Sequence, residues 1–133
     1  SEMKEAHNDL IMVLRKKGNN KAALRICELA LKSHENDDTL HRNKGNILYA
    51  LDKPEKSLEA FEAALELNPY VVDTWVNKGT VLWKSLKKRE EALNAFDKAL
   101  EINPNFMSAV DSRINLMAEI KANKPSFWKR IFG

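Results

Sequence analysis

The sequence repeats itself with a period of 34 to 35 residues. Residues 39–70 and 74–105 align over their whole length, and Gly45 and Gly79 are 34 residues apart, whereas Phe61 and Phe96 are 35 apart. One residue is therefore inserted in the later copy, between the glycine and the phenylalanine. We expect it in the turn between the two helices of that copy, around residues 85–92, because surface turns absorb extra residues at small cost.

Two weaker copies flank these two. Residues 6–36 form an earlier copy, with Cys27 where the next copy has Phe61 and Ile11 where it has Gly45. Residues 107–122 match only the first half of a copy. Periods of this length are typical of solenoids, in which each unit packs on its neighbours. The sequence thus predicts three units followed by one helix that covers the last exposed face.

The composition favours an all-α protein. Hydrophobic residues make up 44% of the 133 residues and charged residues 31%, while glycine and proline number four each. The single cysteine cannot form an intramolecular disulfide, so a reducing compartment is the default. No apolar run approaches the ~20 residues that span a bilayer, and the N-terminus is too polar for a secretory signal. We therefore expect a cytoplasmic protein without a membrane span.

The recurring positions carry a resemblance to a known family. The third copy has a tryptophan, a glycine, an alanine-rich block around a phenylalanine and a closing proline, namely Trp75, Gly79, Leu82, Ala92, Phe96, Ala99 and Pro104. At this period, the pattern resembles the tetratricopeptide repeat (TPR) family. The resemblance implies an all-α fold, a right-handed superhelical α-solenoid of helix-turn-helix repeats with a C-terminal capping helix.

The resemblance covers residues 4–122. It places repeats at 4–37, 38–71 and 72–106 and the capping helix at 107–122, and it leaves a basic aromatic tail at 123–133. Four positions depart from the pattern: histidines stand in the tryptophan position, an isoleucine in the glycine position and a glutamate in the proline position, at His7, His41, Ile11 and Glu35. These departures predict an irregular first repeat on the same fold.

The pattern also makes physical sense without the family. In the second helix of each unit, apolar residues recur at spacings of three and four, which places them on one buried face. Gly45 and Gly79 allow paired helices to approach closely, and Phe61 and Phe96 fill the space beside them. The proline of each Asn-Pro pair ends the second helix because it lacks an N–H and restricts the residue before it.

Function is expected on the concave groove that the resemblance implies, lined by the first helix of each pair. The residues not committed to packing there are mostly polar and rich in asparagine: Asp9, Met12, Asn43, Asn46, Tyr49, Asn77, Thr80, Trp83, Ser112 and Asn115. An amide side chain both donates and accepts, so a row of asparagines can pair with a peptide backbone of any sequence. A mainly structural role for Asn43 and Asn77 stays open.

Some members of the family hold a chaperone's C-terminal carboxylate in a clamp of lysines, an arginine and asparagines. Here Asn43 matches one clamp asparagine, but Asn8 and Met12 stand where a lysine and an asparagine are expected. Asp73 and Asn77 stand where a lysine and an arginine are expected. This comparison argues against chaperone tails of the Hsp90 or Hsp70 type and favours a neutral or mixed-charge peptide.

The tail after Pro125 is short, basic and aromatic. Its large apolar residues, Phe127, Trp128, Ile131 and Phe132, need a surface to cover them. Three interpretations stay open: packing on the last helix as part of the cap, insertion into a neighbouring molecule's groove, or weak anchoring at a membrane surface. The second would make the chain a homo-oligomer.

Other chemistries find little support in the sequence. The net charge of +3 is concentrated in residues 121–133, and the basic turn 84–89 is followed by two glutamates, so we expect no nucleic-acid partner. The histidines at positions 7, 34 and 41 form no metal motif, and Cys27 reads as a buried packing residue. We find no catalytic or cofactor motif.

Together these observations predict a non-catalytic scaffold that docks a protein or peptide, without metal or cofactor. The alternative is a self-assembly module whose ligand is its own tail.

Overall fold

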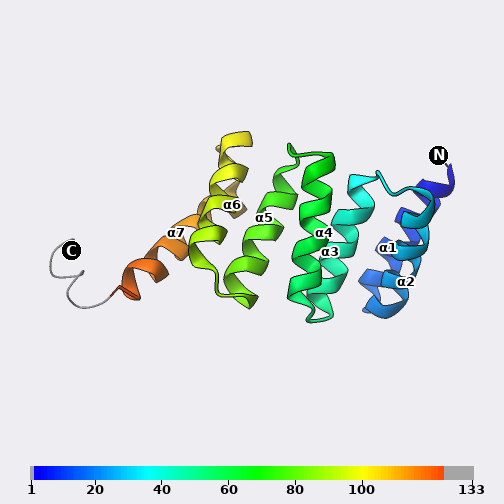
Figure 1. Cartoon of the computed structure of the whole chain (residues 1–133), viewed down its shortest axis with the longest axis horizontal. Helices are drawn as coiled ribbons and strands as arrows, with labels where there is room; N and C mark the ends of the chain where they lie inside the picture. The colour runs from blue at the N-terminus through cyan, green and yellow to red at the C-terminus, as the bar shows by residue number, and fades with distance from the viewer. Residues whose placement is uncertain (1, 125–133) are drawn as a thin grey trace.

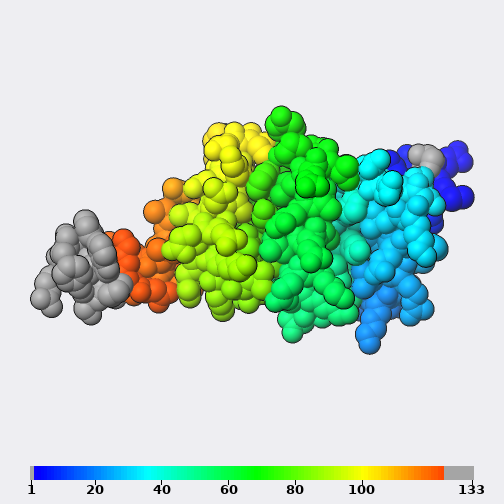
Figure 2. Space-filling view, viewed as in Figure 1, coloured from blue at the N-terminus to red at the C-terminus, as the bar shows by residue number. Residues whose placement is uncertain are grey.

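The computed structural model describes residues 2–124, and every regular element in that range is helical. Three antiparallel pairs follow one another: α1 (Glu2–Lys16) with α2 (Asn20–Ser33), α3 (Asp38–Ala50) with α4 (Pro54–Leu67), and α5 (Val72–Thr80) with α6 (Arg89–Ile102). A π-helical turn, η1 (Val81–Ser85), continues α5, and α7 (Met107–Ala122) follows α6. Figure 1 shows the helices side by side along the long axis, with α1 and α7 at opposite ends. The elongated outline in Figure 2 is that of a solenoid, as the sequence predicted.

Each helix packs mainly on its sequence neighbours, including α7 on α6. Two clusters of buried side chains lie along the solenoid, one across α1, α2 and α3 and the other across α5, η1, α6 and α7, while the buried residues of α4 belong to neither. Since α7 has no following helix among residues 2–124, Ile114 and Met117 stay 60% and 44% exposed. The capping role expected of α7 stays a prediction.

Glycine lets the paired helices touch in the second and third pairs. A Cβ built on Gly45 would lie 2.6 Å from the Phe61 ring, and one on Gly79 would lie 2.6 Å from the Phe96 ring. Both phenylalanines are almost fully buried, at 1% and 0% exposure. Ser57 adds a hydrogen bond beside the first of these contacts, since its hydroxyl donates to the Gly45 carbonyl oxygen at 2.7 Å. The predicted close approach is confirmed.

The inserted residue lies in the helix, which corrects the expectation that it lies in the turn. The Leu86 amide donates to the carbonyl of Val81, five residues back, whereas the equivalent Leu51 amide bonds Ile47, four residues back. The turns themselves are alike, since each has one residue at positive φ, Asp52 at 59° and Lys87 at 57°. A π-helical turn accommodates one extra residue without breaking the helix, so the turn keeps its length.

The ends of the second helices follow the sequence signals. α4 ends at Leu67 and α6 at Ile102, and the residues before each proline, Asn68 and Asn103, have extended backbone. At the start of α3, the Asp37 carboxylate caps the helix by accepting from the Leu40 amide at 3.1 Å. Across residues 2–124, the helices are too short or too polar to cross a membrane.

Candidate functional site on the first helices

The predicted groove residues other than Trp83 lie on α1, α3, α5 and α7, and we call them the first-helix face. Three of them, Asp9, Met12 and Asn115, are well exposed, and Tyr49 is 38% exposed. The others apart from Trp83 are half-buried: Asn43, Asn46, Asn77, Thr80 and Ser112. The face therefore offers a polar surface built from four alternate helices.

Two amide pairs connect neighbouring helices across this face. Asn77 donates from Nδ2 to Asn46 Oδ1 at 3.0 Å, which joins α5 to α3. Asn43 donates from Nδ2 to Asn8 Oδ1 at 3.5 Å, which joins α3 to α1. Asn8 was considered in the sequence only as a clamp position, so its structural partner was missed. These pairs connect α1, α3 and α5 along the face.

The amide pairs leave hydrogen-bonding capacity free for a ligand. Each bond uses one N–H of the donor and one lone pair of the acceptor, while a side-chain amide offers two donors and a carbonyl oxygen. Asn46 therefore keeps both N–H groups, and Asn77 keeps its carbonyl oxygen. Thr80 differs, because its hydroxyl already donates to the Val76 carbonyl of its own helix at 2.9 Å. The asparagines thus combine a structural bond with unused donors and acceptors.

Trp83 lies apart from the exposed face. It is 8% exposed, and its indole packs edge-on against Phe96 with ring centroids 6.2 Å apart. Its Nε1 donates to Glu119 Oε2 at 2.7 Å, and Arg89 donates to the same oxygen at 2.9 Å. The Lys84 ammonium stands 3.6 Å from the centre of the indole. Trp83 therefore holds α7 against η1 and α6 and presents little surface to a ligand.

Glu119 responds electrostatically to these two donors. The pKa of its carboxyl group is lowered below the usual range of a glutamate, first by the hydrogen bond from the Trp83 indole and then by the one from Arg89. No local pattern in the sequence predicts this cluster, because Glu119 lies 36 residues from Trp83 and 30 from Arg89.

A hollow opens at the α1 end of the first-helix face. It has a volume of about 400 Å³ and is lined by Met12, Arg15, Lys16, Asn20 and Ala50. Lys16 and Ala50 are equivalent by the 34-residue period and lie one turn beyond Met12 and Asn46. The periodicity could have extended the predicted face to these positions.

His41 and Cys27 each make a hydrogen bond to the backbone of the protein. His41 Nε2 lies 2.8 Å from the Glu35 carbonyl oxygen, to which it donates in the tautomer that carries the proton there. Cys27 is fully buried, its thiol donates to the Leu40 carbonyl, and burial raises its pKa to about 12. Over residues 2–124, no three histidine, cysteine or acidic side chains gather as metal ligands would. The tail residues Phe127, Trp128, Ile131 and Phe132 lie outside the described residues.

The comparisons with known proteins identify the family. A family model of the tetratricopeptide repeat matches residues 39–70, and a second one matches residues 72–106. Together they cover half of the chain, and the chain belongs to the tetratricopeptide repeat family. No curated protein matches the sequence significantly.

Solved structures support the same fold. The first TPR domain of Spaghetti (RPAP3), bound to the HSP90 peptide SRMEEVD, superposes with a TM-score of 0.85 at 18% identity, covering 90% of this chain and 94% of that one. The Sgt2 TPR domain from Aspergillus fumigatus gives 0.86 at 16% identity over 95% and 87%. YrrB, described as a TPR protein with an unusual peptide-binding site, gives 0.77 at 29% identity over 83% of this chain and 56% of its own.

Proposed function

We propose that this chain is a non-catalytic interaction module that docks an extended peptide or a partner helix on its first-helix face. The observation that carries the proposal is the row of asparagines that bond each other yet keep unused donors and acceptors. Such groups suit a peptide backbone, whose N–H and C=O groups recur regularly along an extended strand. The peptide complex of Spaghetti and the peptide-binding site ascribed to YrrB support the proposal by analogy.

The partner we propose differs from the HSP90 peptide that Spaghetti binds. At the clamp positions this chain has Asn8, Met12, Asp73 and Asn77, and the Asn8 carbonyl oxygen already accepts a bond from Asn43. A peptide ending in acidic residues would meet amides and the Asp73 carboxylate instead of cations. A neutral or mixed-charge peptide suits this surface better.

A peptide-display selection tests the proposal. Random capped dodecapeptides are selected on the full chain, and the dissociation constant of the best is measured by calorimetry. Asn46→Ala and Asn115→Ala should each weaken binding by about three- to tenfold, the loss of one hydrogen bond at ~0.5–1.5 kcal/mol.

Glu66→Ala serves as the matched control, because Glu66 is an exposed residue of the second helix α4. It should leave affinity unchanged, and circular dichroism should show equal helix content in all variants. Selected peptides whose affinity ignores both asparagine substitutions would rule out docking on the first-helix face.

A second candidate function is self-assembly through the tail. It is favoured by the apolar side chains that α7 leaves exposed, Ile114 and Met117, which form a surface that a second molecule's aromatic residues would cover. Deletion of residues 124–133 should then lower the solution mass measured by light scattering. A full-length chain that is already monomeric at high micromolar concentration would eliminate this candidate.

A further inference from the structure

A second pocket lies away from the first-helix face, between α2, α3 and α4. It has a volume of about 420 Å³, within the range of ligand sites. On α3 it is lined by His41, Lys44 and Leu48, whereas Asn43 and Asn46 belong to the first-helix face. At 100° per residue these two sets point to opposite sides of α3. The pocket and the proposed groove are therefore separate surfaces.

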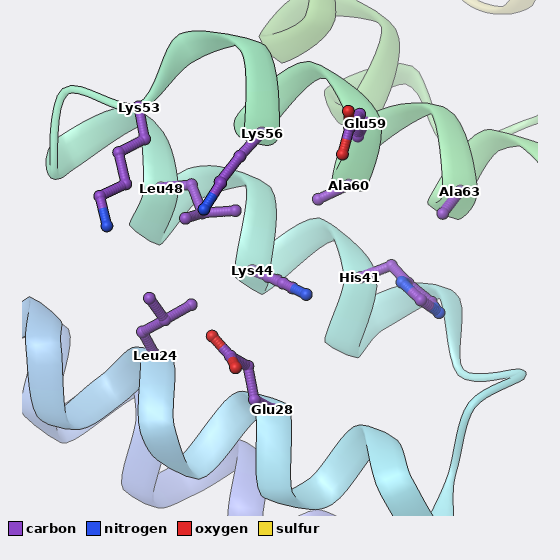
Figure 3. A pocket seen from close by; sticks show the side chains of 10 residues that line it. All are labelled: Leu24, Glu28, His41, Lys44, Leu48, Lys53, Lys56, Glu59, Ala60 and Ala63. Carbon is purple, nitrogen blue, oxygen red and sulfur yellow. The ribbon is translucent and has the colours of Figure 1, made fainter.

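The lining combines an apolar floor with charged walls. Leu24 of α2 and Leu48 of α3 lie at the floor, and Ala60 of α4 closes it (Figure 3). Figure 3 shows the Lys53 and Lys56 side chains extending from the α4 side toward α2. The remaining lining residues are Glu28, His41, Lys44, Glu59 and Ala63.

The next repeat interface shows what normally occupies this place. By the 34-residue period, Trp75 corresponds to His41, Lys78 to Lys44 and Glu62 to Glu28. There Lys78 pairs with Glu62 at 3.9 Å and lies 5.4 Å from the centre of the Trp75 ring. An aromatic ring and an ion pair thus cover the interface between α4, α5 and α6.

We infer that the pocket is open because this interface lacks both the tryptophan ring and the ion pair of the next one. His41 keeps the backbone bond of the tryptophan it replaces, since His41 bonds the Glu35 carbonyl at 2.8 Å and Trp75 bonds the equivalent Pro69 carbonyl at 2.8 Å. Its smaller ring leaves the rest of the tryptophan's volume empty. Among the described residues, Lys44 and Glu28 do not approach within ion-pair distance.

We propose that this pocket binds a segment of a partner protein in which a glutamate or aspartate adjoins a large aliphatic residue. The aliphatic side chain packs on Leu24 and Leu48. The carboxylate lies between the Lys53 and Lys56 ammonium groups at the mouth. Neither lysine has an ion-pair partner among residues 2–124, so each is available to a ligand.

The charges select the occupant. Three lysines and two glutamates line the pocket, so the surroundings favour a single negative charge and would repel a dianion from the glutamates. The apolar floor gives no contact to a free inorganic ion. The chain's own tail carries Lys129 and Arg130, the wrong sign for two lysines.

The experiment titrates a capped octapeptide with one glutamate beside one leucine, GSSLESSG, into the full ¹⁵N-labelled chain and follows amide shifts by NMR. The largest shifts should fall at Glu28, Lys44 and Lys56, and they should diminish as sodium chloride is added. Replacing the glutamate of the peptide by glutamine, or Lys53→Ala with Lys56→Ala, should weaken binding about fivefold or more, the value of two exposed ion pairs.

His41→Trp tests the pocket without altering the lysines. The new ring should fill the space as Trp75 does, and the peptide shifts at Glu28 and Lys44 should disappear. Asn46→Ala should leave the titration unchanged, which separates this site from the first-helix face. Circular dichroism and a thermal melt verify that each variant is folded.

Three results would overturn the proposal. One is the absence of shifts at Glu28, Lys44 and Lys56 up to millimolar peptide. Another is equal binding of the glutamate and glutamine peptides. The third is inorganic phosphate moving the same amides with the peptide's affinity, which would mark a general anion effect of the lysines.

Discussion

A large and a small side chain exchange places between the first repeat and the two that follow. Ile11 stands in the position of Gly45, and Cys27 stands in the position of Phe61. Both Ile11 and Cys27 are fully buried and belong to the same cluster. The summed volume is thus kept while the large residue moves from the second helix to the first, which explains how a departure from the family pattern leaves the fold intact.

The exchange predicts a rescue in a double variant. Ile11→Gly should lower the free energy of unfolding by about 3–5 kcal/mol, a cavity plus a helical glycine. Cys27→Phe should cost about 1–3 kcal/mol by overpacking. Together they recreate the glycine and phenylalanine of the next repeat, so the double variant should be more stable than the sum of the single losses predicts. Urea unfolding measures the coupling, and strict additivity would contradict the exchange.

Glu119 predicts a pH dependence. Its pKa is lowered by the Trp83 and Arg89 bonds, so the native state favours the carboxylate. The resulting stabilisation of the native state is fully present at pH values above the carboxyl pKa in the unfolded chain, about 4.3. It is lost as pH falls through the lower pKa of the native state. Wild type should therefore unfold at higher urea than Glu119→Gln at pH 7, and the gap should close in strong acid. Glu66→Gln, on an exposed α4 residue, is the control; a gap independent of pH would refute the assignment.

At the scale of elements, the helix boundaries follow from local signals, but the π-helical turn does not. These signals are local in sequence: the prolines, the Asp37 cap and the apolar spacing lie within a few residues of the helix ends or faces that they determine. The inserted residue is visible in the sequence, yet its place depends on Trp83 reaching Phe96 and Glu119, which lie on other helices. Tertiary packing therefore selects the π-helical turn over a longer loop.

Deleting Ser85 should convert this turn to regular helix. Trp83 would then occupy the situation of Tyr49, its equivalent by the 34-residue period, which is 38% exposed. In a background with Trp75→Phe and Trp128→Phe, we expect the Trp83 emission to shift to longer wavelength and acrylamide quenching to increase. Ser85→Ala removes the side chain without the deletion and should change neither. An unchanged spectrum in the deletion variant would contradict this role for the inserted residue.

At the scale of the whole molecule, the repeat pattern predicted which helices of the solenoid carry the proposed groove. It did not predict how the side chains on those helices bond one another. The period places Asn46 and Asn77 on successive first helices, while their mutual bond depends on the spacing between helices. The sequence also did not predict the pocket beside His41, because a histidine in a tryptophan position was interpreted as a packing residue. The pocket becomes visible only when the two repeat interfaces are compared in three dimensions.

The two buried clusters predict that stability is divided along the solenoid. Stability in repeat proteins is nearly a sum of units and neighbouring interfaces, so a change at one end should be felt less at the other. Cys27 reports the cluster of α1, α2 and α3, and in a Trp128→Phe background Trp75 and Trp83 report the cluster of α5, α6 and α7. The thiol is buried and its pKa is raised to about 12, so alkylation requires local opening.

Leu116→Ala, in α7, supplies the test. It should lower the unfolding free energy seen by tryptophan fluorescence by about 2–5 kcal/mol. The free energy of opening obtained from iodoacetamide labelling of Cys27 should fall by less than half as much, because Leu116 contacts only the distant cluster. Ile11→Val, in the Cys27 cluster, should show the reverse order. Equal losses from both probes in both variants would mean that the array unfolds as one cooperative unit, with the interface between α4 and α5 strong enough to couple its ends.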